Sequence, residues 1–122
     1  MHDSQEQKLE FQLPKRCRLT GSAQFGAVFS QHKKVSNRHF RILVRYKHDQ
    51  SDSRIGIIVS RRVSRKAVNR NRIKRQLREA FRLNRHKLKN MDLIVIAHRI
   101  CETATNDELS GSVIKLLRKL ES

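Results

Sequence analysis

The chain of 122 residues suits one domain with one hydrophobic core, and we expect a single domain over 1–122 with a flexible tail at 1–16. Its 28 Lys and Arg against 11 Asp and Glu give a net charge of +17, an excess most easily understood if a polyanion neutralises it. No run of about 18 apolar residues and no signal peptide is visible, so we expect no membrane partner and a cytoplasmic location.

The first predicted helix follows the tail. Ser22 is a good N-cap, and Phe25, Val28 and Phe29 then recur at helical spacing. Periodicity alone favours a core role for both phenylalanines. The alternative is a stacking platform for unpaired bases, beside the basic face of the strand that follows.

Two strands are predicted next. Residues 39–47 alternate, which indicates a half-buried strand with one basic face. One face carries Phe40, Ile42, Val44 and Tyr46, and the other carries Arg41, Leu43, Arg45 and Lys47. A polar loop at 48–53 leads into an apolar run at 54–60 that reads as a central strand, and a short extra strand is expected near Val35.

The second half of the chain predicts a long basic helix, a strand and a final helix. Residues 61–89 hold 13 Lys or Arg and a single acid, Glu79, and their apolar side chains cluster on one side of a helical wheel. Residues 91–98 contain a buried strand, and Thr105 with Glu108 forms a capping box that opens the last helix. Because a helix separates the last two strands, we expect a crossover between parallel strands.

The start of the basic helix carries cations on successive turns, as phosphate binding requires. They are Arg70, Arg72, Lys74, Arg75 and Arg78. Arg grips phosphate oxygens in pairs, and a helix N-terminus adds N–H donors and a positive dipole end. The amide of Asn71 can donate to RNA or accept from a hydrated cation. A solvated basic face is the alternative, but so many cations with one acid favour polyanion binding.

Two features favour RNA over DNA as this polyanion. A helix-turn-helix protein places a short helix before its recognition helix, whereas residues 55–60 read as a strand. The basic face of the strand at 39–47 also widens the positive surface, which suits a broad RNA contact better than groove reading. We therefore expect no DNA partner.

No arrangement of side chains favours catalysis by the protein itself. The acids are dispersed, and no acidic pair lies among the basic residues to hold two metal ions. The His residues lack metal-ligand spacing, and Cys17 and Cys101 lie too far apart for a zinc ribbon or a redox motif. If phosphodiester cleavage occurs, we expect another molecule to do the chemistry.

These residues also resemble a known family. The stretch 54–82 closely resembles the signature of the bacterial ribonuclease P protein, in which a strand ending in two basic residues leads into an Arg-Asn-Arg helix. Arg18-Leu19 followed by residues 25–29 is similar to the N-terminal part of that signature, and residues 92–97 are similar to its late strand. The resemblance covers roughly residues 16–98.

The resemblance implies a fold and a function. The fold is an α/β (α+β) sandwich, ribosomal protein S5 domain 2-like, in the order α-β-β-β-α-β-α with a left-handed βαβ crossover against the usual right-handed rule. The function is that of the RNA-binding subunit of ribonuclease P, which helps a catalytic RNA to remove the 5′ leader of precursor tRNA. Both RNAs are the implied partners. Magnesium ions serve the holoenzyme on the RNA, and the protein binds no cofactor tightly.

The resemblance also assigns residues to the two RNAs. Catalytic-RNA contacts are expected at Arg65, Lys66, Arg70, Asn71, Arg72, Lys74, Arg75, Arg78 and Arg82. Leader contacts, in a cleft between the first helix and the sheet, are expected at Phe25, Phe29, Arg41, Leu43, Arg45, Arg61 and Arg62. Some members of the family have an aromatic residue at the position of Leu43 and a Gly before the Arg-Asn-Arg helix, and this sequence has neither.

Two other functions remain open. A basic ribosomal protein would share the charge, and co-purification with ribosomal subunits or with one structured RNA separates these cases. A self-sufficient protein nuclease would cleave RNA unaided, whereas we expect the protein alone to be inactive.

Overall fold

The computed structural model describes residues 13–121, so the first twelve residues of the predicted tail lie outside the described range. The elements are η1 (Lys15–Cys17), α2 (Gly21–Ser30), β1 (Lys33–Ser36), β2 (Phe40–Tyr46), β3 (Arg54–Ile58), α3 (Ala67–Asn84), η2 (Arg85–Lys87), β4 (Met91–Ala97), η3 (Arg99–Glu102) and α4 (Asn106–Lys119). Leu13 is buried and η1 follows it, so ordered structure begins inside the segment predicted as a tail.

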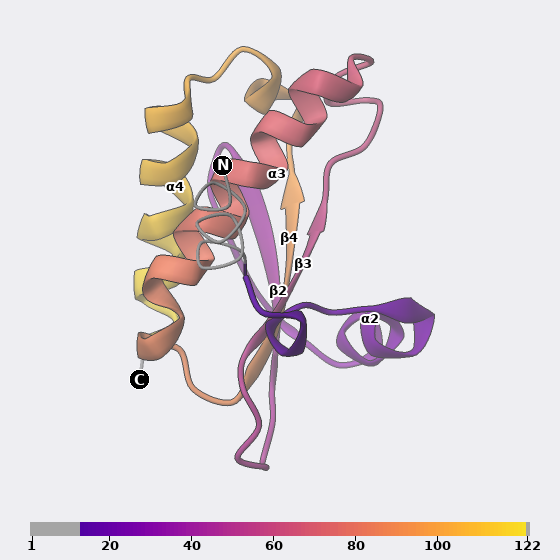
Figure 1. Ribbon diagram of the computed structural model, residues 1–122, viewed down its shortest axis with the longest axis vertical. Coiled ribbons are helices and arrows are strands. Elements are labelled where there is room, and N and C mark those ends of the chain that lie inside the picture. The colour runs from indigo at the N-terminus through magenta and orange to yellow at the C-terminus, as the bar shows by residue number, and fades with distance from the viewer. Residues whose placement is uncertain (1–12, 122) are drawn as a thin grey trace, which may run out of the picture.

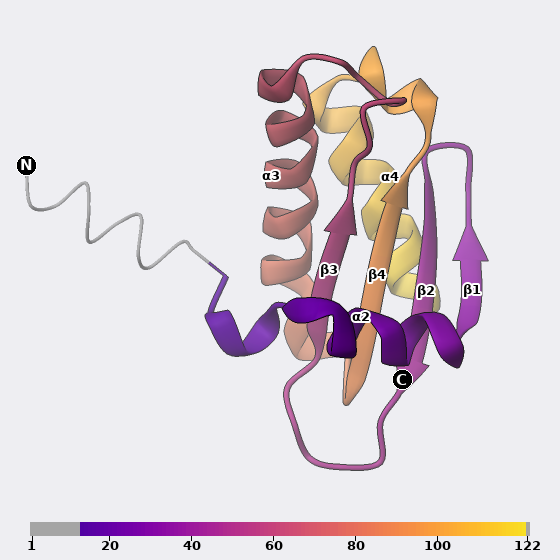
Figure 2. The same cartoon turned by 90° about the vertical axis from the view of Figure 1, so that its right-hand side faces the viewer.

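The four strands form one sheet in the order β1-β2-β4-β3. β2 pairs antiparallel with β1 and β4, and β3 pairs parallel with β4. α2 crosses one face of the sheet, whereas α3 and α4 cover the other (Figure 1). Seen from the α2 side, the chain leaves β3, passes behind the sheet through α3 and enters β4 to the right of β3 (Figure 2). This is a left-handed crossover, so the predicted fold class is confirmed.

The larger core fills the space between the sheet and the layer of α3 and α4. Phe40, Ile42 and Val44 point into it from β2, as their alternation predicts, and each is at most 1% exposed. Phe81 of α3 and Leu116 of α4 meet them from the helix side. Burying a side chain of this size contributes about 1.5–3 kcal/mol, which fixes the apolar stripe of α3 against the sheet and leaves its cations outside.

A smaller core lies under α2 on the opposite face. It consists of Leu19, Val28, Leu43 and Ile94, with the half-buried Phe25, Ile58 and Ile96 packed against it. α2 contacts β2 and β4, and a single helix covers this face among the described residues. Arg41, two residues before Leu43 on the same face of β2, is therefore exposed.

Several boundaries differ from the sequence prediction. The first helix begins at Gly21, one residue before the predicted N-cap Ser22, and Gly21 takes a φ of +75° that favours glycine. β3 ends at Ile58, and α3 begins only at Ala67, because residues 60–64 form a hydrogen-bonded turn between them. The basic segment therefore consists of a turn followed by a helix.

Two local predictions are confirmed. The short strand near Val35 is β1, the edge strand beside β2. The capping box is present, since Oγ1 of Thr105 accepts from the Glu108 N–H and Oε1 of Glu108 accepts from the Thr105 N–H, both at 3.1 Å. The bond from the Thr105 N–H to the carboxylate, followed by the effect of the Thr105 side chain, holds the pKa of Glu108 below its ordinary value.

Candidate nucleic-acid interface

α3 presents a basic surface to solvent. Ile73, Leu77 and Phe81 are buried against the sheet, so the polar sides of the helix face outward. Of the predicted catalytic-RNA contacts, Arg65, Lys66, Asn71, Arg75 and Arg78 are exposed, and Arg70, Arg72, Lys74 and Arg82 are half-buried. The first turn of α3 holds no acid, so its N–H groups and dipole add to the positive potential. We call these nine residues the α3 surface.

Two arginines of the α3 surface are held in place by the protein. Arg70 donates from Nη1 to two backbone carbonyls of the preceding turn, both at 3.0 Å. Arg72 donates from Nε to Asn69 at 2.9 Å and from Nη1 to Asn106 at 2.8 Å, which joins the N-terminal ends of α3 and α4. Each guanidinium keeps further N–H groups for a phosphate, so both residues shape the surface and add to its charge.

A hollow of about 710 Å³ opens at the N-terminal end of α3. It is lined by Arg61, Arg62, Ser64, Arg65, Arg70, Arg99 and Glu102. Arg61 and Arg62, predicted as leader contacts, thus line a hollow together with Arg70 of α3. The segment between β3 and α3, which contains them, runs at the end of the sheet away from α2 (Figure 1 and Figure 2). Arg99 of η3 was not predicted, since a lone Arg after a strand has no pattern that would single it out.

α2 packs across the face of the sheet on which the leader contacts are predicted, and its two phenylalanines differ. Phe25 is half-buried with its ring over Gly56 of β3, where an added Cβ would stand 2.5 Å from Cζ of Phe25. A glycine is needed for so close an approach. Phe29, one turn later, leaves 47% of its surface exposed. Phe25 therefore packs largely as core, whereas Phe29 offers its ring to solvent.

The strand residues beside α2 also differ from one another. Leu43 is 4% exposed and packs with Val28 in the smaller core, so little of it is open to a ligand. Arg41 is exposed and has no ion-pair partner among residues 13–121. We call Phe25, Phe29, Arg41 and Leu43, the predicted leader contacts on the α2 side of the sheet, the α2 crevice. Their contact with a leader stays a prediction.

Asp92 of β4 is a fully buried carboxylate among three cations. Arg54 donates to it from Nε at 2.9 Å and from Nη2 at 2.7 Å, and Nζ of Lys47 lies 3.1 Å away. Arg45, another predicted leader contact, lies 3.6 Å from the same carboxylate. Burial raises the pKa of Asp92, but the bonds from Arg54 and Lys47 outweigh burial and hold that pKa below its ordinary value. The cluster joins β2, β3 and β4 at one end of the sheet.

The α3 surface and the α2 crevice meet at the edge of β3. A cavity of about 150 Å³ lies between Arg18, Phe25 and Gly56 on one side and Lys74 and Arg78 of α3 on the other. The backbone at residues 18–19 pairs with β3, which brings Arg18 to this edge. Two surfaces that are distinct in the sequence are therefore neighbours in space.

The described residues offer binding groups more than reactive ones. Within 13–121 no three His, Cys, Asp or Glu side chains gather to hold a metal ion, and no helix is long and apolar enough to cross a membrane. Glu79, the acid of α3, pairs with Arg82, whose hydrogen bond lowers the pKa of Glu79. Cys17 and Cys101 are free and buried, and burial raises the pKa of Cys101 to about 11.

Comparisons with known proteins agree with this geometry. The sequence profile of the family "Ribonuclease P" matches residues 13–121. The "Ribonuclease P protein component" of Pseudoalteromonas translucida (strain TAC 125) is 32% identical over 111 residues, which cover 91% of this chain and 79% of the relative. That of Cronobacter sakazakii (strain ATCC BAA-894) is 39% identical over 112 residues, 92% of each chain. The Staphylococcus aureus RNase P protein has a TM-score of 0.78 at 29% identity, over 88% of this chain and 100% of that chain.

The fold, the charge and the comparisons lead to one assignment. The sandwich carries its left-handed crossover through the basic helix, and the family profile spans all the residues that the structure describes. The resemblance seen in the sequence is thereby confirmed, and the ribosomal-protein alternative is set aside. The chain belongs to the ribonuclease P protein family, as the RNA-binding subunit that works with ribonuclease P RNA in the endonucleolytic processing of tRNA 5′ ends.

Proposed function

We propose that this subunit, acting in the cytoplasm, binds two RNAs within ribonuclease P through two adjoining surfaces. The catalytic RNA docks on the α3 surface, and the single-stranded 5′ leader of precursor tRNA lies in the α2 crevice. The assignment of the leader rests on the exposed ring of Phe29, which lies on the same side of the sheet as the exposed Arg41. A single strand offers unstacked bases to an aromatic ring and phosphates to Arg, whereas a folded RNA offers mainly its backbone.

The cavity at the edge of β3 supports a continuous path between the two surfaces. Lys74 and Arg78 lie beside Phe25 there, so a leader that leaves the α2 crevice next meets cations of α3. In this arrangement the protein binds the leader close to the surface on which the protein contacts the catalytic RNA. The chemistry then needs no protein nucleophile, and the subunit contributes by binding and positioning.

Within residues 13–121 no three His, Cys, Asp or Glu side chains gather as a magnesium site, and the acids of α3 and β4 already pair with cations. Glu79 pairs with Arg82, and Asp92 is surrounded by Arg45, Lys47 and Arg54. A hydrated magnesium ion binds through free carboxylates or phosphates. We therefore assign the magnesium ions of the holoenzyme to the RNA.

The proposal is tested by comparing precursor tRNA carrying a leader of several nucleotides with mature tRNA. We expect the holoenzyme to bind the precursor more tightly, and the catalytic RNA alone to show a smaller difference. RNA-free protein should cleave neither substrate. Equal affinities of the holoenzyme for both tRNAs would contradict the leader assignment, and cleavage by the RNA-free protein would contradict catalysis by RNA.

Arg75→Gln should weaken holoenzyme assembly about tenfold, because Arg75 is exposed on the α3 surface and makes no ion pair within residues 13–121. Losing one phosphate contact should also reduce the slope of log affinity against log salt concentration by about 1. The measurement is the affinity for the catalytic RNA over a salt series. Lys115→Gln, an exposed cation of α4, is the control. An unchanged slope for Arg75→Gln would remove this residue from the interface.

A further inference from the structure

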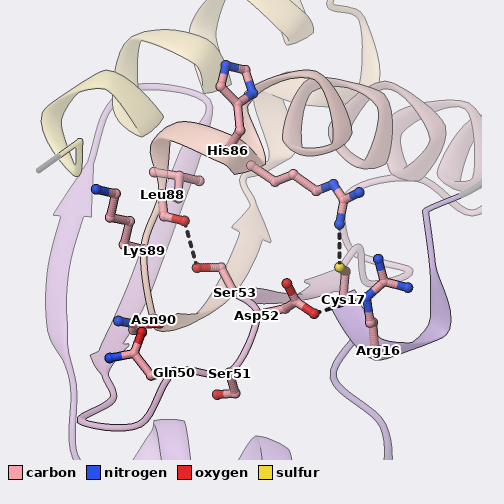
Figure 3. A pocket seen from close by; sticks show the side chains of 11 residues that line it. Arg16, Cys17, Gln50, Ser51, Asp52, Ser53, His86, Leu88, Lys89 and Asn90 are labelled. Atoms are coloured by element: carbon pink, nitrogen blue, oxygen red, sulfur yellow. Dashed lines mark hydrogen bonds and ion pairs between the residues drawn. The ribbon is translucent and has the colours of Figure 1, made fainter.

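A pocket of about 540 Å³ lies at the C-terminal end of α3, far along the helix from the hollow at its N-terminal end. Its walls are η1, the loop between β2 and β3, and η2 with the turn that follows (Figure 3). The lining includes four basic side chains or imidazoles and one carboxylate, namely Arg16, Arg85, His86, Lys89 and Asp52. We call it the η1–η2 pocket. Among these five residues, Asp52 is the one acid.

The walls of the η1–η2 pocket are tied together without a ligand. Oγ of the buried Ser53 donates to the carbonyl of Leu88 and accepts from the N–H of Met91, both at 3.1 Å. The loop before β3 is thereby fixed to the turn before β4, as Figure 3 shows for Ser53 and Leu88. A ligand would enter a site that is already formed, so binding costs little ordering of the chain.

Within residues 13–121, one of the two arginines of the pocket has a carboxylate partner and the other has none. Arg16 donates from Nε to Asp52 at 3.0 Å, which leaves its terminal nitrogens free. The half-buried Arg85 donates from Nη1 to Sγ of Cys17 at 2.9 Å and has no carboxylate partner within residues 13–121. A thiol sulfur is a weak acceptor, so the Arg85 charge is poorly compensated. Arg16 and Arg85 both line the pocket, and Cys17, which accepts from Arg85, directly follows Arg16 in the chain.

The dipole of α3 explains why one cation stands at this pocket, but it does not explain the other two. A cation at the C-terminus of α3 interacts favourably with the dipole, and Arg85 stands there. Arg16 comes from another element, and Lys89 stands on the opposite side of the pocket (Figure 3). The pocket also lies in line with cations of the α3 surface. Lys74, Arg78 and Arg85 follow one another at helical spacing, and about 16 Å of helix separates Lys74 from Arg85.

We propose that the η1–η2 pocket binds a phosphate group of an RNA backbone between the guanidinium groups of Arg16 and Arg85, with Lys89 at the rim. Planar guanidinium groups bind phosphate oxygens in pairs, and a phosphate supplies the acceptor that Arg85 lacks. This deepens the proposed function by extending the RNA contact to the far end of α3. It rests on RNA being the polyanion of α3, and it is independent of the α2 crevice.

The test uses the double variant Arg16→Gln/Arg85→Gln, which removes both guanidinium charges and keeps polar side chains at the two positions, with Lys115→Gln as the matched control. Affinity for the catalytic RNA should fall about tenfold and the salt slope by about 1, while the control keeps both. A second arm measures precursor tRNA binding to the assembled holoenzyme. A third arm titrates inorganic phosphate into the free protein and follows the backbone amides of Cys17 and Asp52 by NMR.

Melting curves check that the variant proteins are folded. If the first double variant is unstable, Arg16→Gln/Lys89→Gln, which changes only exposed side chains, repeats the test.

A loss confined to the catalytic RNA assigns the phosphate to that RNA, and a loss confined to precursor tRNA assigns it to the substrate. Either result supports the proposal. Unchanged affinity and slope for both RNAs in folded variants would overturn it, even if inorganic phosphate binds. The preference of the holoenzyme for a leader is measured in the same samples, so a failure here is distinguishable from a failure of the proposed function.

Discussion

Phe29→Leu should weaken binding of precursor tRNA to the holoenzyme by about 5- to 150-fold, because stacking of a base on an aromatic ring is worth about 1–3 kcal/mol. Leu keeps much of the side-chain volume and removes the ring face, and Phe29 is 47% exposed, so the domain should remain folded. Binding of mature tRNA and of the catalytic RNA should hardly change. The measurement is the affinity of the holoenzyme for both tRNAs, together with a thermal melt of the protein.

Tyr46→Leu is a closely matched control. Tyr46 is also 47% exposed, but it lies on β2 with Phe40, Ile42 and Val44, on the side of the sheet away from α2. Its ring contacts Nζ of Lys33, a cation–π contact of 5.8 Å to the ring centre that is worth little at an exposed site. If Phe29→Leu lowers affinity for both tRNAs equally, or if Tyr46→Leu has the same effect, the ring of Phe29 does not stack on the leader.

The fold was largely predictable because its signals are local and repeated. Alternation along β2 identified the buried set Phe40, Ile42 and Val44, and the S/T-x-x-E pattern located the start of α4 at Thr105. The handedness of the crossover is not a local property. It came from the family resemblance, since the general rule favours the opposite hand.

The candidate sites were less predictable because they depend on which segments meet. The turn after β3 decides that Arg61 and Arg62 stand beside Arg99, and no pattern within either segment shows this. The packing of Phe25 against Gly56 joins two residues that are far apart in the chain. The sequence did carry one signal for the cluster of cations around Asp92. Asp92 is the one acid in an apolar strand, and the strand at 39–47 has a basic face.

Asp92→Asn should destabilise the domain by about 3 kcal/mol, because it removes the carboxylate that three cations approach within 4 Å. Lys47, with a side chain 6% exposed, would lose its ion-pair partner inside the protein, whereas Arg45 and Arg54 reach water more easily. The melting temperature should fall by roughly 10 °C. Asp52→Asn is the control, because its pair with Arg16 is exposed and should contribute less than about 1 kcal/mol.

The pH dependence identifies the cause of this loss. Since the pKa of Asp92 is lowered in the folded protein, its stabilising effect is complete above the ordinary carboxyl pKa of about 4 and is lost as the pH falls through the lower, folded value. The wild type should therefore lose stability in acid through Asp92, and Asp92→Asn should lack this part of the loss. Unfolding free energies of both proteins should differ most near neutral pH and converge below about pH 4. A gap that stays constant into acid would mean that the substitution acts through packing and that the charge of Asp92 contributes nothing.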